Sequence, residues 1–350
     1  MMSTARTKTR LIHSCFSGVL AASLVSPGCA TTGMEKAASG PSLAIEEPTT
    51  RPGLPTILIA MPGSADFMDV RRGLLGEVQK NFNVSTLVVT KDTKEEEVAA
   101  AIERVKPVCA VLMNNATLNL FQAYEAAHKD KPAIPTVVVM ASFLHEIRGQ
   151  LRRATGISYE VPGVTAFVNL RAILETPIHR VGVVYRPVFK SFVERQKEPA
   201  MKEHLTIVGR ELPSGFTADD LREALRTLIN EDRVDALWML NDNLLVRDAQ
   251  FLEETWRGEL RGATVPLVVG VPNLVDPAAS LGTLAVVPDH EALGLQAGNL
   301  IYDLADSGWD IEAHGIDLPL SVKTVVDLRQ TKEYFQLRPD ASKRIDKALE

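Results

Sequence analysis

Leu284-Ala285-Val286-Val287 begins the part of the chain that decides its topology. It is followed by 289–304 and then by 318–320 and 322–326. Its first four residues are apolar and partly β-branched, which indicates a buried strand. The amphipathic stretch 289–304 predicts a helix, and the two later pieces predict short extended segments. A tail with this order suits a chain that crosses from one lobe to another, contributes a helix there and returns.

The body before this segment alternates short apolar runs with longer amphipathic stretches. The runs are continuously apolar rather than alternating, which is typical of strands buried on both faces of a parallel sheet. The amphipathic stretches predict helices that cover such a sheet. Strands are predicted at 56–60, 84–89, 108–113, 134–140, 180–185, 205–209, 236–240 and 266–271. Helices are predicted at 69–80, 94–105, 118–128, 163–174, 188–202, 218–229 and 244–256.

The pattern restarts after Thr155-Gly156-Ile157-Ser158, so two α/β units of similar size follow one another. We therefore predict an α/β fold with two Rossmann-like lobes and a cleft between them. The N-terminal lobe is expected to comprise 54–160 plus about 287–317, and the C-terminal lobe 161–286 plus about 318–350.

The first 28 residues have the features of a bacterial signal peptide. Basic residues lie between Arg6 and Arg10, an apolar region covers 11–25, and small residues lead to Gly28-Cys29. The apolar region is shorter than the roughly 20 residues of a membrane span. Gly28-Cys29 resembles a lipobox, in which cleavage precedes a cysteine that carries a diacylglyceryl group, although Ser26 stands where Leu is usual. An ordinary signal with an incidental cysteine is the alternative.

Residues 29–53 follow as the lipidated cysteine and a flexible tether, because Ala, Ser, Thr, Gly and Pro dominate there. Cys29 is thus the predicted lipidation site. We expect an exported lipoprotein that faces the periplasm, or the outer surface in a single-membrane host, with the membrane as a partner through its anchor. The chain has 38 Lys and Arg against 44 Asp and Glu, and no concentrated basic segment, so nucleic acid is not an expected partner.

The sequence lacks the common motifs of nucleotide binding and of hydrolytic catalysis. It contains no G-x-G-x-x-G after a strand, no Walker A motif, no G-x-S-x-G and no H-E-x-x-H, and its seven histidines are not spaced as metal ligands. We therefore expect no enzyme activity, no cofactor and no metal. Cys109 lies in an apolar run and is expected to be a buried strand thiol.

Polar and aromatic side chains follow the predicted strands at their carboxyl ends, where ligands bind in open α/β sheets. Phe67, Phe143 and Tyr185 are expected to clamp an apolar part of a small ligand. Asn241 or Asp242 would hold a polar end, with Asp242 favouring an amine. Turn or cap chemistry is the alternative, because the same residue types favour turns. The predicted ligand-binding residues are Ser64, Asp66, Phe67, Asn114, Asn115, Ser142, Phe143, Tyr185, Asn241, Asp242 and Asn273.

Several short pieces of the body have a characteristic order and spacing. Residues 155–158 are similar to a Thr-Gly-Val-Ser connection, and residues 180–187 to a strand Ile-Gly-Val-Leu-Tyr-Asn-Pro. Residues 234–242 are similar to a Val-Asp-Ala segment. Residues 289–298 are similar to a helix entry Asp-x-x-x-x-Gly-x-x-Ala-Gly, and 325–331 to a terminal strand with its helix. In these pieces the chain resembles the ABC-transporter substrate-binding proteins of the periplasmic binding protein type I fold, in particular the tryptophan- and tyrosine-uptake binding lipoproteins.

The resemblance implies a lipid-anchored solute-binding protein of an ABC-type import system. Its partners would be a small organic ligand, with amino-acid-like compounds as the leading class, and an ABC permease. The chain has Asn114-Asn115 and Ala141-Ser142-Phe143 where many members have Gly-Thr and Asp-Pro, so the identity of the ligand does not transfer. A ligand sensor of the same fold without a transport role and an α/β enzyme are the alternatives. Permease and ATPase genes beside the gene would favour transport.

Overall fold

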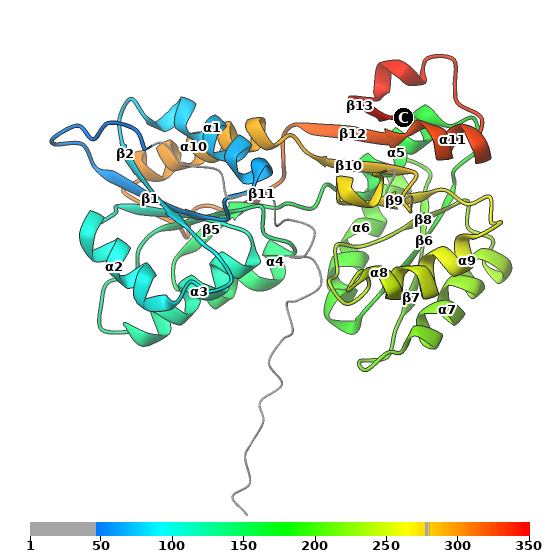
Figure 1. Ribbon diagram of the computed structural model, residues 1–350, viewed down its shortest axis with the longest axis horizontal. Helices are drawn as coiled ribbons and strands as arrows, with labels where there is room; N and C mark the ends of the chain where they lie inside the picture. Colours follow the sequence, from blue (N-terminus) through cyan, green and yellow to red (C-terminus); the bar gives the residue numbers. More distant parts are fainter. Residues whose placement is uncertain (1–46, 277–278, 280) are drawn as a thin grey trace, which may run out of the picture. The chain divides into compact units, whose positions relative to one another are not determined.

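The computed structural model describes residues 47–276, 279 and 281–350, which form two mainly parallel sheets with helices on both faces (Figure 1). This arrangement confirms the predicted α/β class. In spatial order, the first sheet consists of β11 (Ile316–Asp317), β5 (Ala154–Ile157), β4 (Thr136–Val139), β3 (Cys109–Met113), β1 (Thr56–Met61) and β2 (Asn83–Val88). All of its pairings are parallel.

The second sheet is also parallel except at one pair, β10 with β12. In spatial order, it consists of β13 (Lys347–Leu349), β12 (Val322–Asp327), β10 (Leu284–Pro288), β9 (Leu267–Val269), β8 (Ala236–Trp238), β6 (Arg180–Tyr185) and β7 (Thr206–Glu211).

Alternate residues of β1 pack against different helix layers. The long helices of the first sheet are α1 (Ala65–Val78), α2 (Glu95–Val105), α3 (Asn115–Ala127) and α10 (His290–Asp306). Ile57 and Ile59 belong to the core beneath α1 and α10, whereas Leu58 and Ala60 belong to the core beneath α2 and α3. The two-residue period of a strand thus divides one apolar run between two cores.

Helices α1 and α10 approach each other closely through glycines. A Cβ atom at Gly73 would lie 2.0 Å from the carbonyl oxygen of Glu291, and one at Gly294 would lie 1.9 Å from that of Val70. Either distance is far inside van der Waals contact, so only glycine fits at these positions. The sequence-distant α10 is thereby joined to the first helix of the first sheet (Figure 1).

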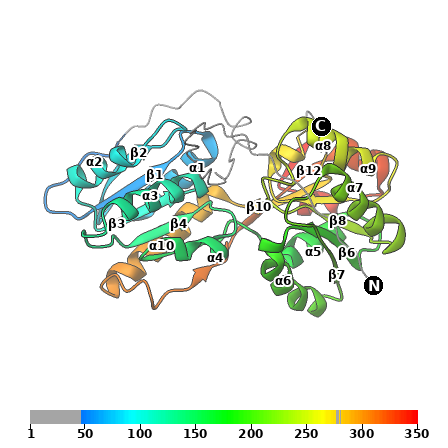
Figure 2. The ribbon, with the colours of Figure 1, turned by 90° about the horizontal axis from the view of Figure 1, so that it is seen from below.

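The second sheet repeats this layering (Figure 2). One face is covered by α5 (Gly163–Ile173) and α6 (Lys190–Lys202), and the other by α7 (Ala218–Arg226), α8 (Ala249–Leu252) and α9 (Gly258–Leu260). Along β6, Val181 and Val183 pack in the first of these cores, and Val184 packs in the second.

The chain passes between the two sheets in its last quarter. After β10 of the second sheet, α10 and β11 belong to the first sheet, and β12 and β13 belong again to the second. Hydrogen bonds tie these passages together: the side-chain amide of Gln296 donates to Leu318 O at 2.9 Å and accepts from Leu320 N at 3.1 Å.

The helix predicted at 244–256 begins later than expected, at Ala249. Its N-cap is Asp248, whose carboxylate accepts a hydrogen bond from Phe251 N at 2.8 Å. Asp242 therefore does not cap this helix, but it has the turn chemistry that the sequence left as an alternative, because its Oδ1 accepts from Leu244 N. Among the described residues, no helix is both long and apolar enough to cross a membrane.

Candidate ligand-binding site

A small cavity lies where strands of both sheets end. Phe143 follows β4 and Glu160 follows β5 in the first sheet, whereas Trp238 ends β8 and Val269 ends β9 in the second. Ligands of doubly wound sheets bind outside these carboxyl ends. The cavity measures about 20 Å³, which is room for a water molecule rather than for an organic solute. A larger ligand therefore requires the lining side chains to move apart.

Four aromatic side chains, which we call the aromatic cluster, pack against one another: Phe143, Phe189, Phe192 and Trp238. All of them except Phe189 line the cavity. The ring of Phe143 stacks on Phe189 with centroids 4.0 Å apart, and it meets Phe192 edge-on at 5.1 Å. Phe192 in turn lies 5.9 Å from Trp238. Aromatic pairs of this kind contribute about 0.5–1.5 kcal/mol beyond the area that they bury. Phe143 thus connects a loop of the first sheet with helices and strands of the second.

The loop that carries Phe143 is strained. Met140 and Phe143 both have left-handed backbone conformations, with φ of 55° and 57°. Non-glycine residues in this region cost on the order of 1–3 kcal/mol and persist where surrounding contacts determine them. Here Phe143 N donates a hydrogen bond to Oε2 of Glu160 at 2.8 Å, and the aromatic cluster holds the ring.

Glu160 is the buried carboxyl group of the site. Its Oε2 accepts hydrogen bonds from Phe143 N and from Ser158 Oγ, the latter at 3.3 Å. Within the described residues, the other oxygen, Oε1, has no hydrogen-bond partner. Burial raises the pKa of Glu160 to about 7, and the negative charge of Glu146 adds to this shift. The group therefore changes its charge near neutral pH.

Asp242 has a different environment, because Arg186 holds it in a two-pronged ion pair. Nε and Nη2 of Arg186 lie 2.6 and 2.8 Å from the two carboxylate oxygens, and Leu244 N donates to Oδ1 at 3.0 Å. Asp242 is only 2% exposed. A ligand amine at Asp242, the role that the sequence favoured, would have to displace this guanidinium.

Of the predicted residues, Asn241 and Phe143 line the cavity. Asn241 lies against Gly270, where a Cβ atom would come within 2.3 Å of its side-chain oxygen. Tyr185 is instead buried in the core of the second sheet, and its ring packs on Gly209. Asn273 is exposed on a short 3-10 helix, Pro272–Leu274.

The polar residues after β3 and β4 bond to one another and to backbone. Asn114 caps α3 by accepting a hydrogen bond from Thr117 N at 2.9 Å. The amide of Asn115 donates to Ser142 O at 3.0 Å and accepts from Ser142 N at 2.7 Å. These bonds fix the loop that leads to Phe143.

The start of α1 is connected to the cavity through His290 and Tyr159. Asp66 Oδ1 lies 3.5 Å from Nδ1 of His290, and Nε2 of His290 lies 3.2 Å from the hydroxyl of Tyr159, which lines the cavity. The hydrogen bond to His290 lowers the pKa of Asp66. Ser64 is the N-cap of α1 but makes no capping bond with its side chain, and Phe67 packs against the core beneath α1. The predicted lipidation site Cys29 lies outside the described residues.

The sequence-based prediction missed Glu160, Tyr159, Phe192 and Trp238. Tyr159 and Glu160 follow Thr155–Ser158, which was interpreted only as a connection between lobes and not as a strand with a carboxyl end. Their position after that strand is the signal that identifies them. Phe192 and Trp238 lie within a helix and a strand, so only the packing of those elements shows that they line a cavity.

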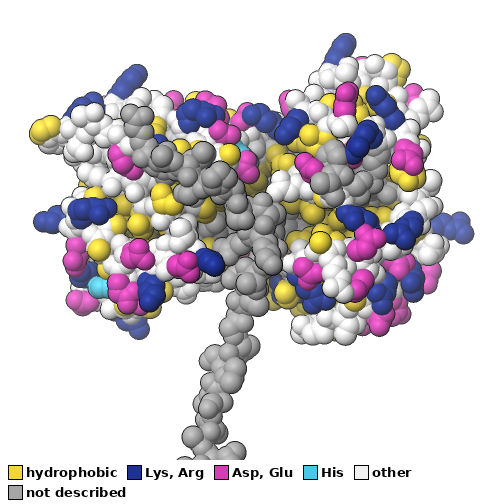
Figure 3. All heavy atoms as spheres, viewed as in Figure 1, with side chains coloured by type: hydrophobic (Ala, Val, Ile, Leu, Met, Phe, Trp, Pro, Cys, Tyr) yellow, Lys and Arg dark blue, Asp and Glu magenta, His cyan; other side chains and the backbone are white. Residues whose placement is uncertain are grey.

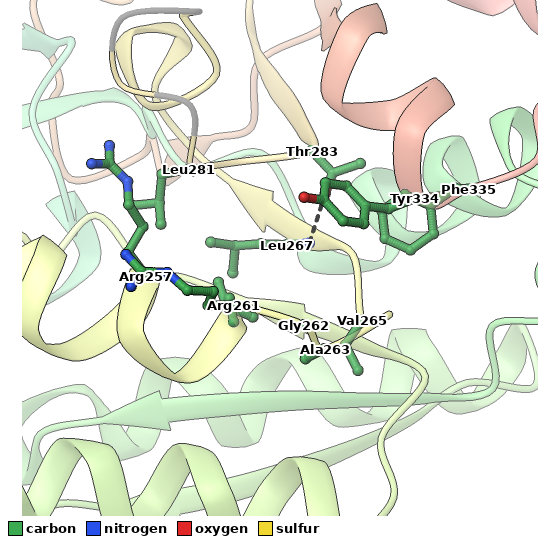
Figure 4. Close-up of a pocket in the computed structure, with 11 residues that line it drawn as sticks. Arg257, Arg261, Gly262, Ala263, Val265, Leu267, Leu281, Thr283, Tyr334 and Phe335 are labelled. Atoms are coloured by element: carbon green, nitrogen blue, oxygen red, sulfur yellow. Dashed lines mark hydrogen bonds between the residues drawn. The ribbon is translucent and has the colours of Figure 1, made fainter.

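A second cavity of about 140 Å³ lies at the opposite end of the second sheet (Figure 4). Leu267 begins β9, and its N–H donates to Thr283 Oγ1 at 3.1 Å. Arg261 on one side is paired with Glu253 at 2.8 Å, and Tyr334 lies on the other side. This cavity lies at the amino ends of the strands, so the smaller cavity at the carboxyl ends is the better candidate for a ligand site.

Charged side chains of both signs are interspersed on the face drawn in Figure 3. Ion pairs among the described residues include Arg226 with Glu259 at 2.7 Å and Lys131 with Glu103 at 2.7 Å. An exposed pair such as Lys131 with Glu103 contributes at most about 1 kcal/mol.

No protein-family model and no curated protein matches the sequence. The fold, in contrast, is similar to solved structures. An ABC domain from Streptococcus pneumoniae in complex with L-Trp is 15% identical, with 84% of this chain and 100% of that chain covered and a TM-score of 0.52. The ligand-free, open structure of a substrate-binding protein with adhesive properties from Clostridium difficile is 15% identical, with 85% and 99% covered and a TM-score of 0.62.

A conserved domain protein from Vibrio cholerae is 16% identical, with 84% and 99% covered and a TM-score of 0.52. At these identities the likeness concerns the fold. Together with the two doubly wound sheets and the chain passages between them, it shows that this chain has the periplasmic binding protein type I fold.

Proposed function

We propose that this chain is an exported, lipid-anchored solute-binding protein of an ABC-type import system. The observation that carries the proposal is the cavity at the carboxyl ends, because segments of both sheets contribute to it. A ligand that contacts Phe143 from the first sheet and Trp238 from the second favours the conformation in which both contacts form. Ligand binding then couples to a change in the arrangement of the lobes, which a permease can recognise.

The lobes in this proposal are 54–160 plus about 287–317 and 161–286 plus about 318–350. Three passages connect them, after β5, β10 and β11. A few residues in such connections can absorb the backbone rotation of a hinge.

An amino-acid-like ligand is the leading class. The aromatic cluster suits an apolar or aromatic side chain, and the polar atoms of Glu160 and Asn241 suit a polar head. The similar domain from Streptococcus pneumoniae was crystallised with L-Trp, which supports this class.

A screen of residues 47–350 tests solute binding directly. Thermal unfolding is measured with amino acids, sugars, nucleosides and aromatic acids, and we expect amino acids to raise Tm. A ligand at 100 times its Kd adds about 2.7 kcal/mol to the free energy of unfolding. If no solute raises Tm, the proposal is wrong.

The position of the site is tested with Phe143→Leu. Loss of the aromatic contacts is expected to weaken ligand binding about 2- to 12-fold, which corresponds to about 0.5–1.5 kcal/mol. Phe121→Leu is the matched control, because Phe121 is an equally buried phenylalanine in the core beneath α2 and α3. Calorimetry that finds equal affinities for the two variants would place the site elsewhere.

Anchoring is tested with Cys29→Ala in the full chain. We expect the variant to leave the membrane fraction, and the intact mass of the wild type to show an acylated Cys29 as its first residue. Cleavage at another bond without an acyl group would contradict the anchor and leave solute binding untouched.

A further inference from the structure

Glu160 is the one charged side chain among the described residues that line the cavity. It is only 8% exposed, and its Oε1 has no hydrogen-bond partner. A buried carboxylate oxygen without a partner is costly, because the protein has replaced its water without supplying a donor. A ligand that brings a donor to this oxygen would recover that free energy.

The carboxyl group of Glu160 is held in place by two donors to one of its oxygens. Phe143 N and Ser158 Oγ both donate to Oε2, and Ser158 is itself buried. The bond from Phe143 N ties the carboxyl group to the strained loop that also presents the ring of Phe143. The polar and the apolar contact points of the cavity are thus fixed relative to each other before a ligand arrives.

We infer that Oε1 of Glu160 binds the ammonium group of the ligand, while the apolar or aromatic part of the ligand packs against the aromatic cluster. This inference rests on the proposed function. Ammonium and carboxylate form the strongest type of hydrogen bond in proteins, and aromatic faces also attract cations. The lining residues include no Lys, Arg or His that would repel the ammonium group.

Neighbouring charges support a cationic ligand. Glu146 of the short helix α4 (Leu144–Ile147) is ion-paired with Arg195 of α6 through one oxygen, while its second oxygen is buried and has no hydrogen-bond partner within the described residues. Its negative charge acts on Glu160. Titratable groups nearby among the described residues also include Tyr159 and, through the hydroxyl of Tyr159, His290 with its partner Asp66.

Binding of an ammonium group is then coupled to proton release. Since the pKa of Glu160 is raised to about 7, the free protein carries a proton there at slightly acid pH. The ammonium group binds the ionised carboxylate, so the proton leaves to solvent. Roughly nine-tenths of a proton would be released per ligand near pH 6, and affinity would rise about tenfold between pH 6 and pH 8.

A neutral ligand gives the opposite sign. A hydroxyl or carbonyl acceptor would bind the protonated carboxyl group, so its affinity would fall as pH rises and its binding would take up a proton. The sign of the pH dependence therefore identifies the charge of the group that Glu160 recognises.

The experiment uses four probes that share one phenyl ring: phenylalanine, phenethylamine, 3-phenylpropionate and 2-phenylethanol. Calorimetry near pH 6 and pH 8, in buffers of different ionisation enthalpy, gives affinity and proton release together. We expect the two amines to bind, with affinity that rises with pH. Glu160→Gln should weaken their binding on the order of 10- to 100-fold and abolish the pH dependence and proton release.

Glu125→Gln is the matched control, because Glu125 is an equally buried glutamate that pairs with Arg152 away from the cavity. It should behave as the wild type, and His290→Gln should retain the pH dependence. Equal binding of 2-phenylethanol or 3-phenylpropionate, or wild-type pH dependence in Glu160→Gln, overturns the inference and leaves solute binding intact.

The wider screen distinguishes failure of the inference about Glu160 from failure of the proposed solute-binding function. If the ligand found in the screen has no ammonium group, the inference is overturned. If it is an amine other than phenylalanine, that amine is used in the same test. If the wild type binds no solute at all, the proposed function itself fails.

Discussion

At the scale of single residues, Glu160 makes stability depend on pH. Its pKa is about 7 in the folded protein against an ordinary 4.5. Between these values the folded state binds more protons than the unfolded chain, so the free energy of unfolding falls as pH rises and levels off above about pH 7. Glu160→Gln should therefore be more stable than the wild type by up to about 3 kcal/mol near pH 8 and no different near pH 4. Urea unfolding across this range measures the difference, and a gap independent of pH would contradict it.

A second residue-scale prediction concerns the buried pair of Arg186 and Asp242. Arg186→Met leaves the carboxylate of Asp242 buried and without its counter-charge, so we expect a loss of about 3–5 kcal/mol in the free energy of unfolding. Adding Asp242→Asn removes the orphaned charge and should restore part of the loss. Urea denaturation of the two variants tests this, and additive losses would show that the pair is not energetically coupled.

The residues of the site divide into those that sequence patterns reveal and those that require packing. Phe143 and Asn241 could be found because each follows a buried strand. The engagement of Asp242 could not, because its partner Arg186 lies 56 positions away and only the pairing of β6 with β8 brings them together. The raised pKa of Glu160 likewise depends on burial, which no local pattern gives.

At the scale of secondary-structure elements, the contact of α1 with α10 depends on two glycines. Gly294→Ala would place a methyl group 1.9 Å from Val70 O, so we expect a loss of about 1–3 kcal/mol or more. Gly76→Ala in α1 is the control: nothing lies within 4 Å of its Cβ position, and the change should stabilise the helix by about 0.5–1 kcal/mol. Chemical denaturation compares the two, and equal effects would mean that the helices can separate without cost.

Most strands could be predicted because continuous apolar runs identify them, and β6 begins and ends where the sequence indicates. The element after β8 could not be placed as well. Asp242 and Asp248 are both suitable caps by residue type: Asp248 caps α8, whereas Asp242 accepts from Leu244 N in the preceding turn and also pairs with Arg186. Local sequence therefore permits two helix starts and does not choose between them.

At the scale of the whole molecule, the order of apolar runs was enough to predict two α/β units and a tail with a further strand and helix. A continuous apolar run indicates a buried strand without reference to the rest of the chain, so the class of the fold follows from the sequence. The cavity does not follow in this way, because Phe143 follows a strand of the first sheet and Trp238 ends a strand of the second. Whether both residues line one cavity depends on the packing of elements that lie far apart in the sequence.

The passages between the sheets lead to a prediction about which parts of the chain fold together. Leu293, Ala297 and Ile301 of α10 share a core with Val70 and Leu74 of α1. A fragment of residues 47–160 keeps α1 but lacks α10, so one face of its sheet is only partly covered and we expect it not to unfold cooperatively.

Joining 47–160 to 289–317 should restore a cooperative unit. The hydroxyl of Tyr159 lies 3.2 Å from Nε2 of His290, so the two ends to be joined are close together. A flexible linker of about six Gly and Ser residues has a root-mean-square span of about 13 Å, which is sufficient. Urea unfolding followed by circular dichroism should show a single sigmoidal transition for the joined chain, with a smaller m-value than that of 47–350 because less surface is exposed. A cooperative transition in 47–160 alone, or none in the joined chain, would show that the proposed N-terminal lobe has the wrong boundaries.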